Sequence, residues 1–225
     1  TGQASQGERT VDLLVGIPAY NHARTLGHVV RTVSAGLRRY FPEARAMICV
    51  SDGGSADGTR EEMEKIPSQE IPLVVTTHPV HALDKVSVPY RGILGQDKAY
   101  RTFLETAQSH GAKACAVVDP DLKSISPEWV EGLLRPVVAE GFDFVSPLFA
   151  RKKFDGTITQ GILYPLTRAL YGKRVSQPLG GNLGFSRRLV DLYLSKAAWE
   201  SALLRVGPDI WMTTLAVAGE FKICQ

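Results

Sequence analysis

The most constraining feature of the sequence is an alternation between two hydrophobic periods from residue 11 to about residue 150. Short apolar runs, typical of buried strands, occupy residues 11–17, 46–52, 71–78, 113–119 and 142–149. Segments with helical spacing of apolar residues lie between them, at 26–37, 57–65, 97–109 and after Pro127. Strands that are apolar on both faces and alternate with helices indicate an α/β fold with a mainly parallel sheet flanked by helices.

The pattern also divides the chain. Residues 1–10 have no apolar core and are expected to form a disordered or tag-derived tail, not a signal peptide. Residues 11–150 carry the strand–helix alternation, whereas residues 151–225 shift to helices and Gly-rich loops. We expect a single domain with these two halves. Because residues 219–225 stop within a strand-like run, we also expect the C-terminus to be incomplete.

Composition narrows the classes of function. The 225 residues are 44% hydrophobic and carry a net charge of only +3, which argues against nucleic-acid binding. No apolar run approaches the roughly 20 residues of a membrane span. Two of the three cysteines, Cys49 and Cys115, lie in strand-like runs, which favours reduced thiols and a cytoplasmic location. The composition leaves open whether the chain forms a homodimer.

Polar side chains follow three of the predicted strands. They form the stretches Pro18–Asn21, Ser51–Gly53 and Asp119–Asp121. In open parallel sheets, ligands bind beyond the carboxyl ends of the strands. The sequence therefore predicts a ligand site at this edge of the sheet.

Two carboxylates, Asp119 and Asp121, lie one residue apart after an apolar run. Such a pair can ligate Mg²⁺ or Mn²⁺ through hard oxygen atoms, and the ion can take its remaining ligands from substrate phosphates and water. The alternative is that Asp119 caps a turn and Asp121 is solvated, which is the more frequent outcome for an isolated pair of this kind.

The other two stretches suit a nucleotide. Asp52 can accept hydrogen bonds from a base or ribose, Gly53 allows close approach, and Ala19 leaves backbone open to a planar base. The alternatives are an Asx turn at Asp52, with Asp57 as a helix N-cap, and a helix N-cap at Asn21. The dinucleotide fingerprint G-x-G-x-x-G does not occur here.

In this order and spacing, "VGIPAYN", "VSDGGSADGT" and "VVDPDL" resemble the motifs of GT-A glycosyltransferases of the family-2-like group. The resemblance spans residues 11–150 and implies a Rossmann-like GT-A fold. It implies that Asp119 and Asp121 bind the metal, Mg²⁺ or Mn²⁺. The donor nucleotide would be bound by Pro18, Ala19, Tyr20, Asn21, Ser51, Asp52, Gly53, Lys98 and Asp119.

The second half resembles the acceptor region of the retaining glucosyl-3-phosphoglycerate synthase and mannosylglycerate synthase group, through "GTITQGILYPLTRALYG", "QPLGGNLGFSRR" and "GPDIWMTT". This implies acceptor binding by Thr159, Gly180 and Gly181, and catalytic roles for Asp209, Gly180 and Asn182. Asn182 stands where that group commonly has an acid. The group's metal-binding His, the third ligand, would lie beyond residue 225.

The resulting hypothesis is a metal-dependent glycosyltransferase that moves a sugar from a UDP- or GDP-sugar to a small acceptor. Phosphoglycerate or glycerate is the anionic candidate, for which Arg151, Lys152, Lys153 and Arg168 could supply charge, although a solvated basic face is an equal alternative. The resemblance implies retention; otherwise Asp209 could act as the general base of an inverting enzyme. A nucleotidyltransferase and an inactive nucleotide-binding module remain alternatives.

Overall fold

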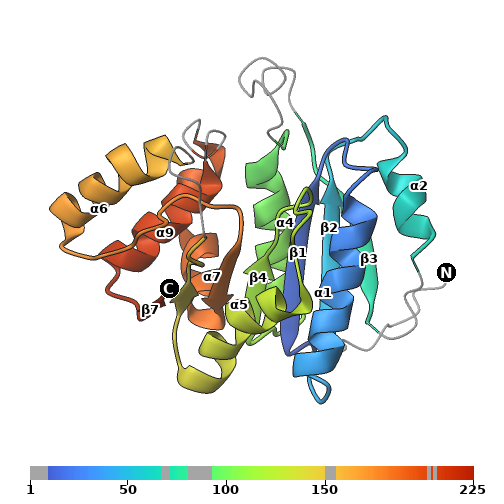
Figure 1. The fold of residues 1–225 in the computed structure, drawn as a ribbon, viewed down its shortest axis with the longest axis horizontal. Coiled ribbons are helices and arrows are strands. Elements are labelled where there is room, and N and C mark those ends of the chain that lie inside the picture. Colours follow the sequence, from blue (N-terminus) through green and yellow to red (C-terminus); the bar gives the residue numbers. More distant parts are fainter. Residues whose placement is uncertain (1–9, 67–70, 81–92, 150–155, 202–203, 205–206) are drawn as a thin grey trace.

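The computed structural model describes residues 10–66, 71–80, 93–149, 156–201, 204 and 207–225. A central sheet is flanked by helices on both faces (Figure 1). Its strands are β1 Leu13–Ala19, β2 Ala46–Asp52, β3 Leu73–Thr77, β4 Ala114–Val117, β5 Phe144–Val145, β6 Leu183–Ser186 and β7 Ile223–Cys224. The longer helices are α1 Leu26–Tyr40, α4 Gln96–Ser109, α5 Pro127–Glu140, α6 Tyr164–Tyr171, α7 Arg187–Ser195 and α9 Pro208–Ala218. Shorter ones are α2 Thr59–Glu64, the π-helix η1 Thr159–Leu163 and the 3₁₀-helix η2 Ala197–Glu200.

The sheet has the strand order β3-β2-β1-β4-β6-β5-β7. Strands β3, β2, β1 and β4 are mutually parallel, and β6 pairs antiparallel with both β4 and β5. The expected α/β fold with a mainly parallel sheet is therefore confirmed. Both halves of the chain contribute to this one sheet, because β6 and β7 lie beyond residue 150.

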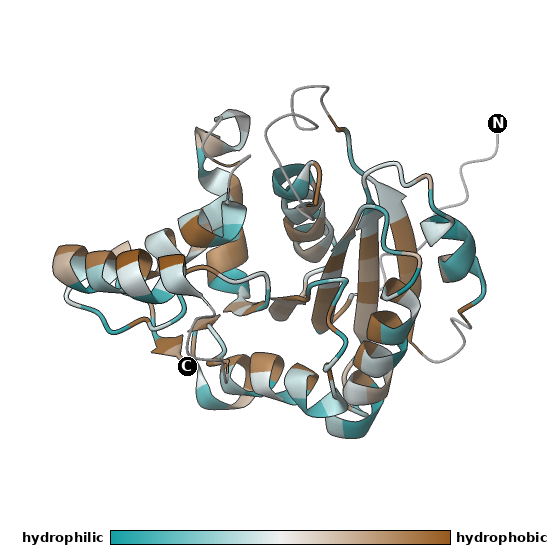
Figure 2. Ribbon diagram, turned by 45° about the horizontal axis from the view of Figure 1, so that its top comes forward, coloured by the Kyte–Doolittle hydropathy of each residue, from teal (hydrophilic) through white to brown (hydrophobic). Residues whose placement is uncertain are grey.

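Two apolar layers cover the faces of the sheet. Side chains alternate along β1, so that Leu14 faces α4 and α7 while Leu13 and Val15 face α1 and α5. Figure 2 shows the resulting band of hydrophobic strands at the centre of the molecule. This burial on both faces explains why the strands appear in the sequence as continuous apolar runs.

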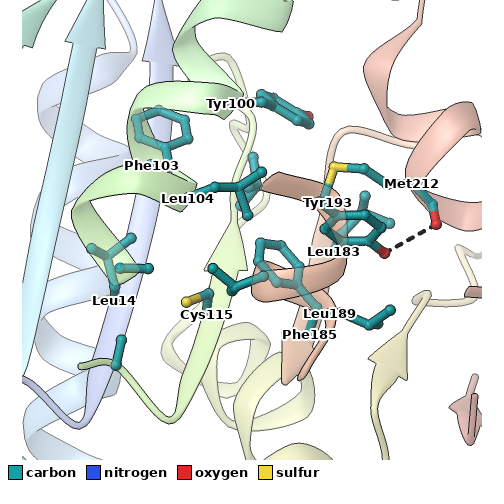
Figure 3. Close-up of a cluster of buried hydrophobic side chains, with 14 of the residues drawn as sticks. Leu14, Tyr100, Phe103, Leu104, Cys115, Leu183, Phe185, Leu189, Tyr193 and Met212 are labelled. Carbon is teal, nitrogen blue, oxygen red and sulfur yellow. Dashed lines mark hydrogen bonds between the residues drawn. The ribbon is translucent and has the colours of Figure 1, made fainter. Parts of the chain in front are cut away.

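The layer under α4 is drawn in Figure 3. The ring of Phe103 packs directly on β1 at Gly16, where a Cβ atom would come within 2.5 Å of the ring. Tyr193 lies next to Phe185 and donates a hydrogen bond from its hydroxyl to the Met212 carbonyl oxygen at 3.0 Å. These contacts fix α4, α7 and α9 against the sheet, so loops from both halves of the chain are held in defined positions.

Three expectations differ in detail from the structure. The strand expected at 142–149 is only Phe144–Val145, because Pro147 lacks an N–H group for continued pairing. The N-cap of α2 is Gly58, not Asp57, although the Asp57 carboxylate accepts a hydrogen bond from the Thr59 N–H group at 3.1 Å. Asn21 is not the N-cap of α1, which is Thr25.

The segment from η1 to α6 projects from the end of the molecule opposite α2 (Figure 1). Helix α6 has no buried residue, and Ile158, Ile162, Leu166 and Leu170 are all at least half exposed. Among the described residues, no helix is long and apolar enough to span a membrane.

Candidate functional site

The loops after β1 and β2 are joined into one surface. Pro18 and Ala19 lie opposite Ser51 and Asp52 in the parallel register. Past the strands, the N–H group of Asn21 donates to Ser55 Oγ at 2.7 Å, and Asn21 Oδ1 accepts from the N–H group of Ala56 at 2.9 Å. The structure thus brings together the two loops, after β1 and β2, that were expected to bind the nucleotide.

The carboxylate of Asp52 is satisfied within its own loop. Oδ2 accepts from the N–H groups of Gly54 and Ser55 at 3.2 and 3.1 Å, and Oδ1 accepts from the Ser55 hydroxyl. Asp52 is 1% exposed. This is the Asx-turn arrangement, so Asp52 first of all builds the loop.

Gly53 packs against the interior. A Cβ atom at this position would lie 2.9 Å from His78 Nε2 and 3.1 Å from the Leu94 carbonyl oxygen. His78 is buried, and its ring joins Ser51 Oγ at 3.0 Å to the Leu94 carbonyl oxygen at 2.7 Å. Since a carbonyl only accepts, Nε2 carries a proton, and in the neutral ring Nδ1 accepts from the Ser51 hydroxyl. Gly53 therefore has a packing role in addition to the nucleotide contact expected from the sequence.

His22 reaches the same edge of the sheet. Its Nδ1 accepts a hydrogen bond from the Tyr20 N–H group at 3.1 Å, which leaves the proton of a neutral ring on Nε2. Burial lowers the pKa of His22, although the charges of Asp121, Asp57 and Asp52 act in the opposite direction. The ring thus lies within electrostatic reach of Asp121.

Asp119, after β4, is held by the second half of the chain. Its N–H group donates to Asn182 Oδ1 at 3.1 Å, and its Oδ2 accepts from Asn182 Nδ2 at 3.2 Å. Asn182 is 2% exposed. A Cβ atom on Gly181 would meet Asp119 Oδ1 at 1.8 Å, so the carboxylate lies directly against this glycine.

Asp209 is attached to the same loop. Its Oδ2 accepts a hydrogen bond from the Gly180 N–H group at 3.0 Å, and the side chain is buried in the first turn of α9. Residues 180–182 therefore connect two carboxylates, Asp209 and Asp119, that are far apart in the sequence.

These acids influence one another. Burial raises the pKa of Asp119 to about 7, with further upward contributions from Asp121 and Asp209 and a downward one from the Asn182 hydrogen bond. Burial also raises the pKa of Asp209. Among the described residues, none of the groups that shift the pKa of Asp119 is a cation. A partly exposed carboxylate that two nearby acids disfavour as an anion favours a neutralising partner, either a proton or a cation.

A divalent ion fits this chemistry if other ligands complete its shell. Asp121 is exposed and within electrostatic reach of Asp119, so both can offer oxygen atoms. Within the described ranges, no group of three or more His, Cys, Asp or Glu side chains could hold an ion alone. Asp119 and Asp121 would therefore share a Mg²⁺ or Mn²⁺ ion with substrate phosphates and water.

The remaining predicted residues are placed less centrally. Lys98 donates from Nζ to the Trp199 carbonyl oxygen at 3.2 Å and lies 3.7 Å from Asp97, so its ammonium group is engaged there. Thr159 is the buried first residue of η1. Arg168 is exposed on α6, while Arg151, Lys152 and Lys153 lie outside the described residues.

Two residues at this site were not predicted from sequence. Burial raises the pKa of Tyr100 on α4 well above the usual value, and the charges of Asp209 and Asp119 raise it further. His78 braces the loop after β2. Neither belongs to a short motif, and Tyr100 contributes to an ordinary helical stripe, so local sequence carried no signal for either role.

Comparison with known proteins agrees with this geometry. Residues 14–191 match the family described as Glycosyl transferase family 2. No curated protein sequence matched the chain. Among solved structures, it resembles glucosyl-3-phosphoglycerate synthase from Mycobacterium tuberculosis in complex with Mn²⁺, UDP-glucose and phosphoglyceric acid, at 25% identity and a TM-score of 0.58.

The same synthase with Mg²⁺ and UDP, and with phosphoglyceric acid, gives 25% identity and a TM-score of 0.57 in each case. In these comparisons the match covers 80% of this chain and 57–58% of the synthase, so the chain spans less than two thirds of that protein's length. The family match covers most of the chain and includes all three strand-end loops. The chain belongs to glycosyl transferase family 2.

Proposed function

We propose that the protein is a metal-dependent glycosyltransferase that transfers a sugar from a UDP- or GDP-sugar to a small acceptor, with retention of anomeric configuration. Phosphoglycerate or glycerate is the proposed acceptor. Family membership and the likeness to a synthase solved with Mn²⁺, UDP-glucose and phosphoglyceric acid support the reaction class.

A single observation carries the proposal. Asp119 is a partly exposed carboxylate whose pKa burial raises to about 7, and among the described residues no cation contributes to this shift. It lies at the carboxyl edge of the parallel sheet, where Asp121 adds a second, exposed carboxylate. An acid this poorly neutralised is typical of a functional site, here one that receives a cation with a diphosphate.

In this proposal the chain's own residues bind and orient the substrates. The surface formed by Pro18–Asn21 and Ser51–Gly53 holds the base and ribose. Asp119 and Asp121 would hold the ion, which stabilises charge on the leaving diphosphate when bound. Residues 180–182, Thr159 and Asp209 border the donor sugar and place the acceptor hydroxyl beside the anomeric carbon, since positioning supplies much of the rate.

Retention is proposed on the likeness to the synthase, and the position of Asp209 is compatible with it. Its Oδ2 already accepts a hydrogen bond from the Gly180 N–H group, so this carboxylate has an evident role in fixing the loop. The anomeric configuration of the product, read by proton NMR, tests this part. An inverted product would instead assign Asp209 the role of general base.

The central experiment measures nucleotide binding by calorimetry. Wild-type protein should bind UDP or GDP with Mn²⁺ and only weakly with EDTA. Asp121→Ala should lower the Mn²⁺-dependent affinity at least about tenfold, because it removes a direct ligand. Asp121 is exposed, so its unfolding midpoint should stay near that of the wild type.

Asp191→Ala is the matched control, since Asp191 is an exposed acid on α7 that pairs with Arg187. It should bind nucleotide like the wild type. Equal affinity in Asp121→Ala and wild type would contradict the metal assignment. Mn²⁺-dependent binding without turnover of any UDP- or GDP-sugar, with phosphoglycerate, glycerate or neutral acceptors present, would indicate an inactive binding module.

A further inference from the structure

The loop Gly180–Asn182 touches Asp119 in two independent ways. The Asn182 side chain spans the Asp119 backbone N–H group and the carboxylate oxygen Oδ2, at 3.1 and 3.2 Å. Gly181 lies against the other oxygen, Oδ1, with room for no side chain. The loop therefore restrains both the backbone and the carboxylate of Asp119.

We infer that Gly181 and Asn182 form a positioning loop that sets the orientation and availability of the Asp119 carboxylate toward a divalent cation. This inference rests on the proposed function, because it assumes that Asp119 is a metal ligand. In this inference, Gly181 and Asn182 affect metal binding by positioning Asp119. This role is separate from any contact that they make with sugar or acceptor.

The hydrogen bonds show how the loop acts. By donating to Oδ2, the Asn182 amide occupies one lone pair of that atom and fixes the plane of the carboxylate. By accepting from the Asp119 N–H group, the same amide locks the chain where β4 ends. Asn182 is buried and lies 63 positions from Asp119 in the sequence. The turn after β4 therefore does not set this carboxylate orientation by itself.

The other end of the loop is anchored separately. The Gly180 N–H group donates to Asp209 at the start of α9, and Leu183–Ser186 pair with β4 immediately afterwards. The loop is thus fixed between a helix start and a strand next to Asp119. Residues that hold a metal ligand in place commonly change metal affinity by about 10–100-fold when replaced.

The test measures Mn²⁺ binding directly, by electron paramagnetic resonance of free Mn²⁺, with the ion alone and with UDP or GDP. Asn182→Ala should weaken Mn²⁺ binding about tenfold or more. Gln108→Ala is the matched control, because it also removes an amide that donates to a carboxylate, that of Asp191 at 3.0 Å, away from the site. It should leave Mn²⁺ affinity unchanged.

Two glycine substitutions give a second matched pair. Gly181→Ala should displace the Asp119 carboxylate and weaken Mn²⁺ binding, since the new Cβ atom would overlap Oδ1. At Gly132, exposed on α5 away from the site, an added Cβ atom meets nothing within 4 Å, so Gly132→Ala should keep Mn²⁺ affinity. Urea unfolding of each variant separates this effect from lost stability.

The outcomes distinguish the two proposals. Wild-type Mn²⁺ affinity in folded Asn182→Ala and Gly181→Ala would overturn the positioning role while leaving the metal site intact. Absence of Mn²⁺ binding in the wild type itself, with either nucleotide, would overturn the proposed function. If Asn182→Ala fails to fold, Asn182→Ser keeps a polar group that is too short to span both Asp119 atoms and should weaken Mn²⁺ binding alike.

Discussion

Strand β2 ends at a buried acid, Asp52, and β4 is followed by a partly exposed acid, Asp119, and the two carboxylates differ in their hydrogen bonds. Asp52 receives hydrogen bonds from three donors of its own loop, two backbone N–H groups and the Ser55 hydroxyl. Within the described part of the chain, the carboxylate of Asp119 receives one hydrogen bond, from Asn182, and the charges of Asp121 and Asp209 raise its pKa further.

The difference indicates that Asp52 stabilises its loop, whereas Asp119 needs a proton or a cation to neutralise its charge. Three donors compensate the burial of Asp52, so its removal should cost stability. Asp119 has too little compensation, so its ionisation should itself cost stability in the metal-free protein. The following predictions test that contrast, from the largest expected effect to the smallest.

The largest expected effect is that the stability of the metal-free protein depends on pH. The pKa of Asp119 rises from 3.8 to about 7 on folding, so between these values the folded state holds a proton that the unfolded state has lost. Stability should therefore fall as pH rises from about 4 to about 7. At about 1.4 kcal/mol per pKa unit, the loss amounts to at most about 4 kcal/mol.

Urea unfolding in EDTA across this pH range, compared between wild type and Asp119→Asn, measures this contribution. The variant lacks the titrating group and should show a flatter profile. Parallel profiles for the two proteins would contradict the contrast, because they would show that Asp119 ionises as easily in the folded state as in the unfolded one.

The next effect concerns Asp52. Asp52→Asn replaces one acceptor oxygen by an NH₂ group facing hydrogen-bond donors, so the free energy of unfolding at pH 7 should fall by about 1–3 kcal/mol. Asp119→Asn, measured identically in EDTA, should show no such loss. Equal destabilisation by the two substitutions would remove the distinction between the two loops.

The smallest effect concerns the link between the loops after β1 and β2. Ser55 Oγ accepts from the Asn21 N–H group at 2.7 Å and donates to the Asp52 carboxylate, so Ser55→Ala removes both bonds and should cost about 1 kcal/mol. Ser109→Ala is the control, because its hydroxyl bonds locally to the Thr106 carbonyl oxygen and is exposed. If Ser109→Ala costs as much in urea unfolding, the link between loops has no special role.

Much of this architecture could be predicted from the sequence. The five apolar runs and the helical stripes gave the order of strands and helices up to residue 150, and β2 has the predicted bounds, Ala46–Asp52. The motifs at the ends of β1, β2 and β4 pointed to one edge of the sheet, because parallel strands bring their carboxyl ends together. Local periodicity suffices where an element is buried along its whole length.

Prediction was weaker where elements are short. Strand β6 has only four residues, and the sequence pattern indicated a Gly-rich loop there. In the structure Gly184 lies in β6, opposite Ala116 of β4, and a Cβ atom there would come within 2.1 Å of the Leu133 carbonyl oxygen on α5. Close packing between β6 and α5, and not a turn, explains this glycine.

By itself, then, the sequence determined the strand–helix order and which acids follow which strands, since both depend on residues close together in the chain. Only the tertiary structure decided that Asn182 would bind Asp119 and that Gly180 would bind Asp209. The physical reason is that hydrogen bonds between distant residues require the antiparallel β6 and the start of α9 to be packed in place first. Their partners are set by the assembled sheet and not by local spacing.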